Sequence, residues 1–163
     1  MDAREREELI REYEMGPARL RAAWEKVPAE ARQWRPDEDK WSAHEVVVHC
    51  ADSESNASLR IRYLVAEKEP LILGYDQADW ARVLDYHAHP ADVALRTVDA
   101  VRAHTLPMIR RLQLADWAKQ GRHTESGPYG AEDWLRSYAR HLEGHAQQIE
   151  RNLEAWLTSR RSS

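Results

Sequence analysis

The sequence predicts an all-α protein, an antiparallel four-helix bundle with a long connection between its second and third helices. Four blocks carry apolar residues at helical spacing, and stretches rich in proline and glycine separate them. No segment shows the sustained alternation of apolar and polar residues that is typical of a strand, so we expect no sheet. With 163 residues and no internal repeat, the chain is expected to form one domain over residues 1–163.

The first two helices are predicted from about Ala3 to Val27 and from Ala43 to about Glu67. Gly16–Pro17 interrupts the first block, and because proline lacks a backbone donor we expect a kink or a break there. Ser42 is a favourable N-cap for the second helix, and Glu45 three residues later completes the pattern of a capping box.

The third and fourth helices are predicted from Pro90 to about Leu114 and from Ala131 to about Thr158. Pro107 should kink the third helix. The connection 68–89 leaves room for a short helical piece near its middle. Residues 121–130 (GRHTESGPYG) are predicted to form a loop.

Composition narrows the classes of partner. Lys and Arg number 24 against 28 Asp and Glu, a net charge of −4, which argues against nucleic acid as a partner. No run approaches the roughly 18 apolar residues that span a membrane, and the N-terminal residues are too charged for a secretory signal. The single Cys50 forms no internal disulfide, which fits a reducing cytoplasm, and its apolar surroundings predict a core residue. We therefore expect a cytoplasmic protein.

His141 and His145 lie four residues apart in the middle of the apolar face of the fourth predicted helix. At about 100° per residue their rings project from the same side, one turn apart, which is how helical sites offer two imidazoles to one metal ion. Two separate core histidines, each hydrogen-bonded to a neighbour, would show the same spacing. The spacing alone leaves both interpretations open.

The second predicted helix contains the string HEVVVH, from His44 to His49. It is one residue longer than the HExxH zinc motif, so the two rings point about 140° apart and the motif is excluded. We expect His44 to be exposed in the first turn. His49 lies in a polar stripe that either faces solvent or lines an internal pocket, and periodicity does not decide between the two. The other histidines, His87, His89, His104 and His123, are predicted to lie on the surface.

Several segments together resemble the DinB/YfiT-like family of metalloenzymes. They are WSAHEVVVHCADSE from Trp41 to Glu54, GYDQADWA from Gly74 to Ala81 and YARHLEGHAQQIERNLEAW from Tyr138 to Trp156, with RPDEDKWS before the second helix. The resemblance covers nearly the whole chain in order. It implies a four-helix bundle in which three histidines hold one divalent metal ion, here His49, His141 and His145. Zinc, nickel, iron(II) and manganese all suit such ligands.

The resemblance implies less about the reaction. It favours a metal-dependent enzyme that transfers a low-molecular-weight thiol cosubstrate to small electrophilic molecules. A metal-dependent hydrolase and a non-catalytic stress-response protein that binds metal or ligand are the alternatives. The expected partner is a small molecule, with no nucleic acid or membrane, and the resemblance also fits a homodimer. The sequence identifies no catalytic residue.

Polar residues near His49 receive two further predicted roles. The predicted substrate-binding residues are Asn56, Arg60 and Tyr63. The carboxylates that would orient His49 by accepting a hydrogen bond from its ring are Glu45, Asp52 and Glu54.

Overall fold

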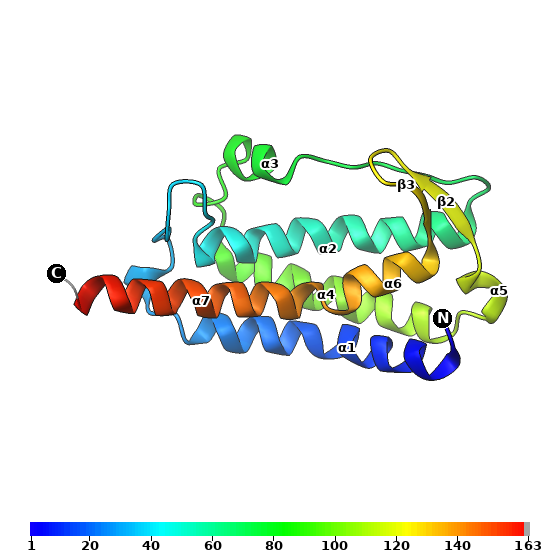
Figure 1. Ribbon diagram of the computed structural model, residues 1–163, viewed down its shortest axis with the longest axis horizontal. Helices are drawn as coiled ribbons and strands as arrows, with labels where there is room; N and C mark the ends of the chain where they lie inside the picture. Colours follow the sequence, from blue (N-terminus) through cyan, green and yellow to red (C-terminus); the bar gives the residue numbers. More distant parts are fainter. Residues whose placement is uncertain (162–163) are drawn as a thin grey trace.

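The computed structural model describes residues 1–161, and its long helices form the predicted four-helix bundle (Figure 1). The helices are α1 (Ala3–Glu25), α2 (Ala43–Ala66), α4 (Ala91–Arg110) and the pair α6 (Ala131–Ala139) and α7 (His141–Arg161). A 3-10 turn, η1 (Ala29–Ala31), follows α1, and the short helix α5 (Leu114–Trp117) follows α4. Within residues 1–161, no helix is both long enough and apolar enough to cross a membrane.

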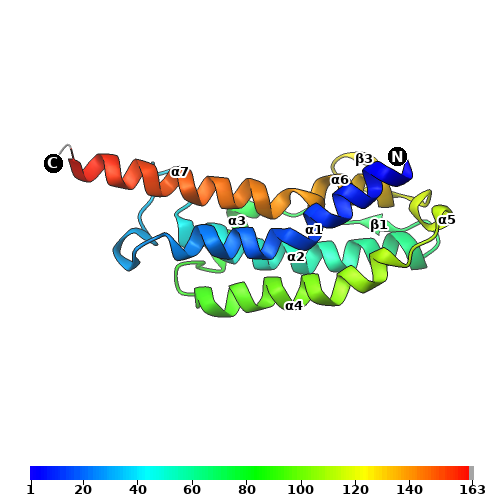
Figure 2. The ribbon, with the colours of Figure 1, turned by 90° about the horizontal axis from the view of Figure 1, so that it is seen from below.

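The long connection between α2 and α4 sets the topology of the bundle. It runs back along the whole length of α2, so α4 begins at the same end of the bundle as α2 and runs in the same direction (Figure 1). α1 and α7 also run in the same direction and pack together, while α1 is antiparallel to α4, and α2 to α7 (Figures 1 and 2). The connection carries the short helix α3 (Gln77–Val83), whose N-cap Asp76 accepts a hydrogen bond from Asp79 N at 2.9 Å.

The structure contains a small sheet, which contradicts two of the predictions made from the sequence. Strands β1 (Leu71–Ile72), β2 (Gln120–His123) and β3 (Gly127–Gly130) form it, with β1 parallel to β2 and β2 antiparallel to β3. The prediction of no sheet was wrong, and residues 121–130 form most of a β-hairpin rather than a loop. Strands of two to four residues are too short to show a period of two, and their pairing joins segments about fifty residues apart.

Local sequence explains where α2 begins. Ser42 Oγ accepts a hydrogen bond from Glu45 N at 3.2 Å, and Ser42 N donates to Glu45 Oε2 at 2.9 Å, so the predicted capping box is present. Cys50 lies in the core on this helix, as predicted, and burial raises the pKa of its thiol.

The first helix continues through Pro17 rather than breaking there, and it bends along its length (Figure 2). Gly16 allows α1 to approach α7 closely, because a Cβ at this position would lie 3.1 Å from the Cβ of Leu142. Pro17 has no N–H to donate to the carbonyl of Tyr13, four residues earlier. Arg102 Nη1 donates to that free carbonyl instead, at 2.7 Å.

The predicted fourth helix is divided at Arg140, where φ is −108° and ψ is 4°. The carbonyl of Tyr138 would accept from Leu142 N in a continuous helix, but here it accepts from Arg102 Nη2 at 2.8 Å. The expectation of one unbroken helix from Ala131 to Thr158 was therefore wrong. The division makes His141 the first residue of α7.

Arg102 is thus the point at which the helices of the bundle meet. Its side chain is buried, and Nε and Nη2 each donate to one oxygen of Glu54 at 2.6 Å. Burial by itself would raise the pKa of Glu54, but the guanidinium of Arg102 and the ring N–H of His141 outweigh it and hold that pKa below its usual range. With the carbonyls of Tyr13 and Tyr138, this ion pair joins α1, α2, α4 and α6.

We expect Arg102→Met to lower the free energy of unfolding by about 3–5 kcal/mol, because it leaves a buried carboxylate and two buried carbonyls without their donor. Arg96→Met is the matched control on the same helix. Arg96 bonds to Asp92 on an exposed surface, where an ion pair contributes little to stability. Urea denaturation of both variants measures the difference, and equal losses would contradict the central role of Arg102.

Candidate metal centre

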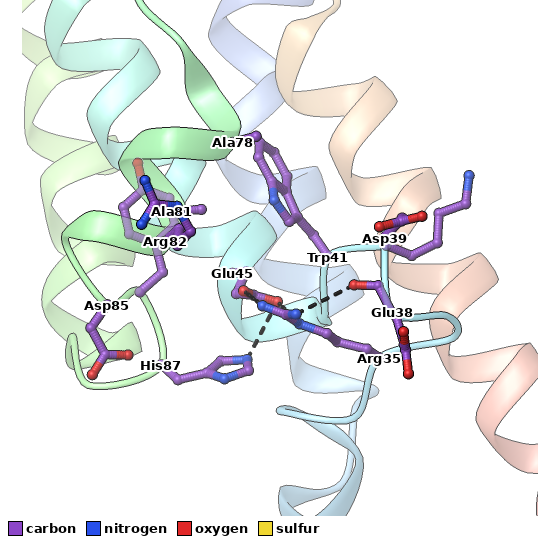
Figure 3. A pocket seen from close by; sticks show the side chains of 12 residues that line it. Arg35, Glu38, Asp39, Trp41, Glu45, Ala78, Ala81, Arg82, Asp85 and His87 are labelled. Carbon is purple, nitrogen blue, oxygen red and sulfur yellow. Dashed lines mark hydrogen bonds and ion pairs between the residues drawn. The ribbon is translucent and has the colours of Figure 1, made fainter.

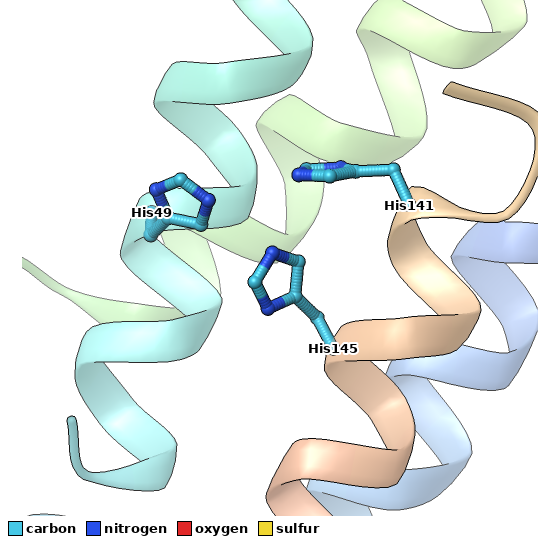
Figure 4. Close-up of side chains that lie close together, drawn as sticks. All are labelled: His49, His141 and His145. Carbon is cyan, nitrogen blue, oxygen red and sulfur yellow. The ribbon is translucent and has the colours of Figure 1, made fainter. Parts of the chain in front are cut away.

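Three histidines from two helices converge inside the bundle (Figure 4). His49 projects from α2, and His141 and His145 project from the first two turns of α7. One ring nitrogen of each lies within 4.8 Å of a ring nitrogen of the others. The ring centroids of His141 and His145 are 4.6 Å apart, and those of His49 and His145 are 4.8 Å apart. His49 is only 1% exposed, so its stripe faces the interior at this point.

Hydrogen bonds at Nδ1 indicate that Nε2 is the candidate ligand atom of both His141 and His145. His141 Nδ1 lies 2.9 Å from Glu54 Oε1, and His145 Nδ1 lies 2.9 Å from Gln148 Oε1. Both partners are acceptors, so each Nδ1 carries a proton, and in the neutral ring Nε2 is the nitrogen that keeps a lone pair. This is the arrangement that metal-binding histidines use, with an oxygen holding the far side of the ring.

His49 differs from the other two because its Nδ1 is buried and has no hydrogen-bond partner among the described residues. The ring packs against Trp41 at 4.7 Å between centroids, which supplies apolar contact only. A buried polar atom without a partner costs about 1–3 kcal/mol. The donor set and this unpaired ring therefore fit a bound cation.

The electrostatics of the cluster also suit a cation. Burial, followed by the neighbouring rings of His145 and His141, lowers the pKa of His49 to about 2. Burial and the ring of His141 lower the pKa of His145 to about 4. Both imidazoles are therefore neutral at pH 7, which is the form that binds a metal ion.

The three carboxylates predicted to orient His49 have other partners. Glu54 accepts from His141 instead, and so orients a different histidine of the cluster. Glu45 accepts from Arg35 Nε at 2.9 Å, and Asp52 accepts from Tyr86 Oη at 2.6 Å.

The three residues predicted to bind substrate lie in different surroundings. Arg60 lines a cavity of about 230 Å³ together with His141 and Ser53. The amide of Asn56 donates to Asp52 O in its own helix at 2.9 Å, and Tyr63 is 49% exposed. The substrate-binding role of all three stays a prediction.

Two histidines expected on the surface are buried. His44 packs under the end of the long connection, where its Nε2 lies 2.8 Å from His89 O. His123, on strand β2, lines the same cavity as His141. His44 is covered by a segment distant in sequence, so local spacing carried no signal of its burial. The ring of His123 is held within its own hairpin, where Glu125 N donates to its Nδ1 at 3.2 Å and the ring of Tyr129 lies 5.7 Å away. His104 is exposed as predicted, and so is His89.

A second cavity, of about 430 Å³, lies at the N-terminal end of α2 (Figure 3). Arg35 and Glu45 form an ion pair across it, and His87 lies 3.4 Å from Glu45 Oε2. None of the three clustered histidines lines it. Trp41 links it to the histidine cluster, because its side chain lines this cavity and its ring packs against His49.

Comparison with known proteins matches residues 12–149 to the model of the DinB superfamily. A relative from Oceanobacillus iheyensis is 30% identical over 109 residues, which cover 67% of this chain and 63% of the relative. One from Bacillus mycoides is 31% identical, covering 67% and 62%. Both are named as putative metal-dependent hydrolases. The match thus spans less than two thirds of the length of these relatives.

A solved structure gives an independent comparison of the fold. YfiT from Bacillus subtilis matches with a TM-score of 0.86 over 93% of this chain and 87% of its own, at 22% identity. It is described as a probable metal-dependent hydrolase with an unusual four-helix bundle topology. The shared topology agrees with the parallel placement of α2 and α4.

We expect the metal-free protein, kept in chelator, to lose stability as the pH falls below about 6.5. The unfolded chain then binds protons at His49 and His145, whereas the folded chain does not until the pH nears their lowered pKa values of about 2 and about 4. Between pH 7.5 and pH 5.5 each histidine should account for about 1.4 kcal/mol.

Urea denaturation at the two pH values measures this loss in the wild type, in His145→Gln and in the exposed control His104→Gln. The loss should be about 1.4 kcal/mol smaller in His145→Gln than in the wild type. The control should show the same loss as the wild type. An equal loss in wild type and His145→Gln would show that His145 is not held neutral in the folded state.

Proposed function

Because the chain belongs to the DinB superfamily, we propose that it is a metal-dependent hydrolase of a small-molecule substrate. The observation that carries the proposal is the convergence of His49, His141 and His145 beside a cavity that His141 itself lines. The names of the relatives favour hydrolysis and offer no support for the thiol transfer that the sequence favoured. The hydrolase alternative therefore becomes the main proposal.

In this proposal the three histidines hold one divalent ion, with zinc, nickel, iron(II) and manganese all compatible with imidazole ligands. Held by these three histidines, such an ion would leave a position for water or substrate, would act as a Lewis acid and would lower the pKa of a bound water to about 7.

The residues around the cluster position and protect it. Glu54 holds the Nδ1 proton of His141, and because Arg102 occupies both its oxygens it serves to orient the ring rather than to accept a proton. Trp41 covers the ring of His49 and excludes water from that side. Ser53 Oγ lies 3.4 Å from His141 Nε2, on the side where the cavity opens, and can donate a hydrogen bond to a substrate oxygen there.

We expect chelator-treated protein to take up about one divalent ion per chain, measured by calorimetry with zinc and nickel. Replacing His49, His141 or His145 by Ala should weaken binding by roughly 100-fold or more, since partners of the ligands alone contribute about 10–100-fold. His104→Ala, which removes an exposed histidine, should bind as the wild type does. Uptake below about a tenth of an equivalent would remove the basis of the proposal.

The activity itself is tested with a panel of chromogenic esters and anilides of small acids. Hydrolysis should disappear on chelation, return with metal and be absent in His141→Ala. Stoichiometric metal binding without hydrolysis of any compound would favour the non-catalytic alternative. If turnover required an added thiol, the thiol-transferase prediction would replace the hydrolase proposal.

A further inference from the structure

We propose that the cavity beside His141 binds a carboxylate group of the substrate, and that Arg60 is the residue that holds it. The inference rests on the proposed function and adds the class of substrate, which is a small ester or amide that carries a free carboxylate a few bonds from the group that is hydrolysed.

The residues that line the cavity favour a negatively charged ligand. It consists of hydroxyl groups, imidazoles, one side-chain amide and the guanidinium of Arg60. Of the nine described residues that line it, none is Asp or Glu. Hydroxyl and guanidinium groups donate hydrogen bonds to anions, and a carboxylate accepts at two oxygens.

Arg60 retains a charge that the protein does not neutralise. Its Nη1 donates to Tyr138 Oη at 3.0 Å and its Nη2 to Leu73 O at 2.6 Å, and both partners are uncharged. Among residues 1–161 no carboxylate forms an ion pair with it, whereas Arg102 is paired with Glu54. A guanidinium carries five donors, so Arg60 has donors left for a ligand.

The acidic residues closest along α2 are bonded elsewhere. Glu54 is held by Arg102 and His141, and Asp52 accepts from Tyr86. Neither is placed to neutralise Arg60. A partly buried charge without a counterion is costly, and an anionic ligand would offset that cost.

Tyr138 connects Arg60 to the metal centre. Its hydroxyl accepts from Arg60, and its ring lies 5.5 Å from the ring of His141. Its hydroxyl also lines the cavity and carries a proton that it can donate to the same anion. The ring of Tyr75 lies 5.7 Å from the Arg60 guanidinium. A carboxylate at Arg60 would therefore lie beside the metal ligands, within reach of the Tyr138 hydroxyl.

The test uses the monohydroxamates of succinic, glutaric and adipic acid, each paired with a compound in which a carboxamide replaces the free carboxylate. The hydroxamate binds the metal in both members of a pair, so their difference in affinity reports only the carboxylate. Calorimetry on the zinc-loaded protein should give, for at least one chain length, about 10-fold or more tighter binding of the carboxylate, as expected for a charge-assisted hydrogen bond.

Arg60→Gln should abolish this preference and leave binding of the carboxamide compounds unchanged, and Arg60→Lys should retain part of it because the charge remains. Arg62→Gln is the matched control. It removes the same charge two residues along α2, where the guanidinium bonds to Ser58 and lies outside the cavity. Its preference should equal that of the wild type.

The outcomes distinguish a failure of the carboxylate inference from a failure of the proposed metal-dependent function. If all six compounds fail to bind, the open metal position is absent and both proposals fall. If both members of every pair bind equally well, the metal site stands and the carboxylate inference is wrong. A preference that survives in Arg60→Gln, or is lost equally in Arg62→Gln, would overturn the assignment to Arg60.

Discussion

The buried guanidinium of Arg102 donates to both oxygens of Glu54 and to the carbonyls of Tyr13 and Tyr138. Two irregularities of the helices supply those carbonyls, since Pro17 cannot donate to one and the division at Arg140 releases the other. A buried ion pair is stabilising only when its remaining hydrogen-bonding capacity is met, and here the distortions of α1 and α6 meet it. The packing of α1, α2, α4 and α6 against one another therefore depends on the side chain of Arg102.

The same interaction extends to the candidate metal centre, because Glu54 Oε1 accepts both from Arg102 Nη2 and from His141 Nδ1. The orientation of one proposed ligand is thereby tied to the packing of the whole bundle. The histidine cluster lowers the stability of the metal-free fold, since burial lowers the pKa of His49 to about 2 and leaves its Nδ1 unpaired. A bound cation would offset that cost, which links the stability of the fold to its proposed function.

The long connection between α2 and α4 contributes to the site as well as to the topology. By running back along α2 it brings the carbonyl of Leu73 to Arg60 and the ring of Tyr75 above the same guanidinium. The sheet that the connection forms with the β2–β3 hairpin places His123 and Tyr129 in the wall of the cavity. The histidine cluster belongs to the helices, whereas much of the proposed substrate site belongs to the segments between them.

Local sequence was enough for the four helices, the Ser42–Glu45 capping box and the shared face of His141 and His145, because helical spacing and caps depend on residues three or four apart. Family resemblance, rather than spacing, distinguished His49 from His44. Only the tertiary structure decided the division at Arg140, the small sheet, the burial of His123 and the choice of His141 as the partner of Glu54. The division, the pairing of β1 with β2 and the Glu54–His141 contact each join residues far apart in the chain, as Arg102 with Tyr138 does. A local sequence pattern does not show which distant group satisfies a buried donor or acceptor.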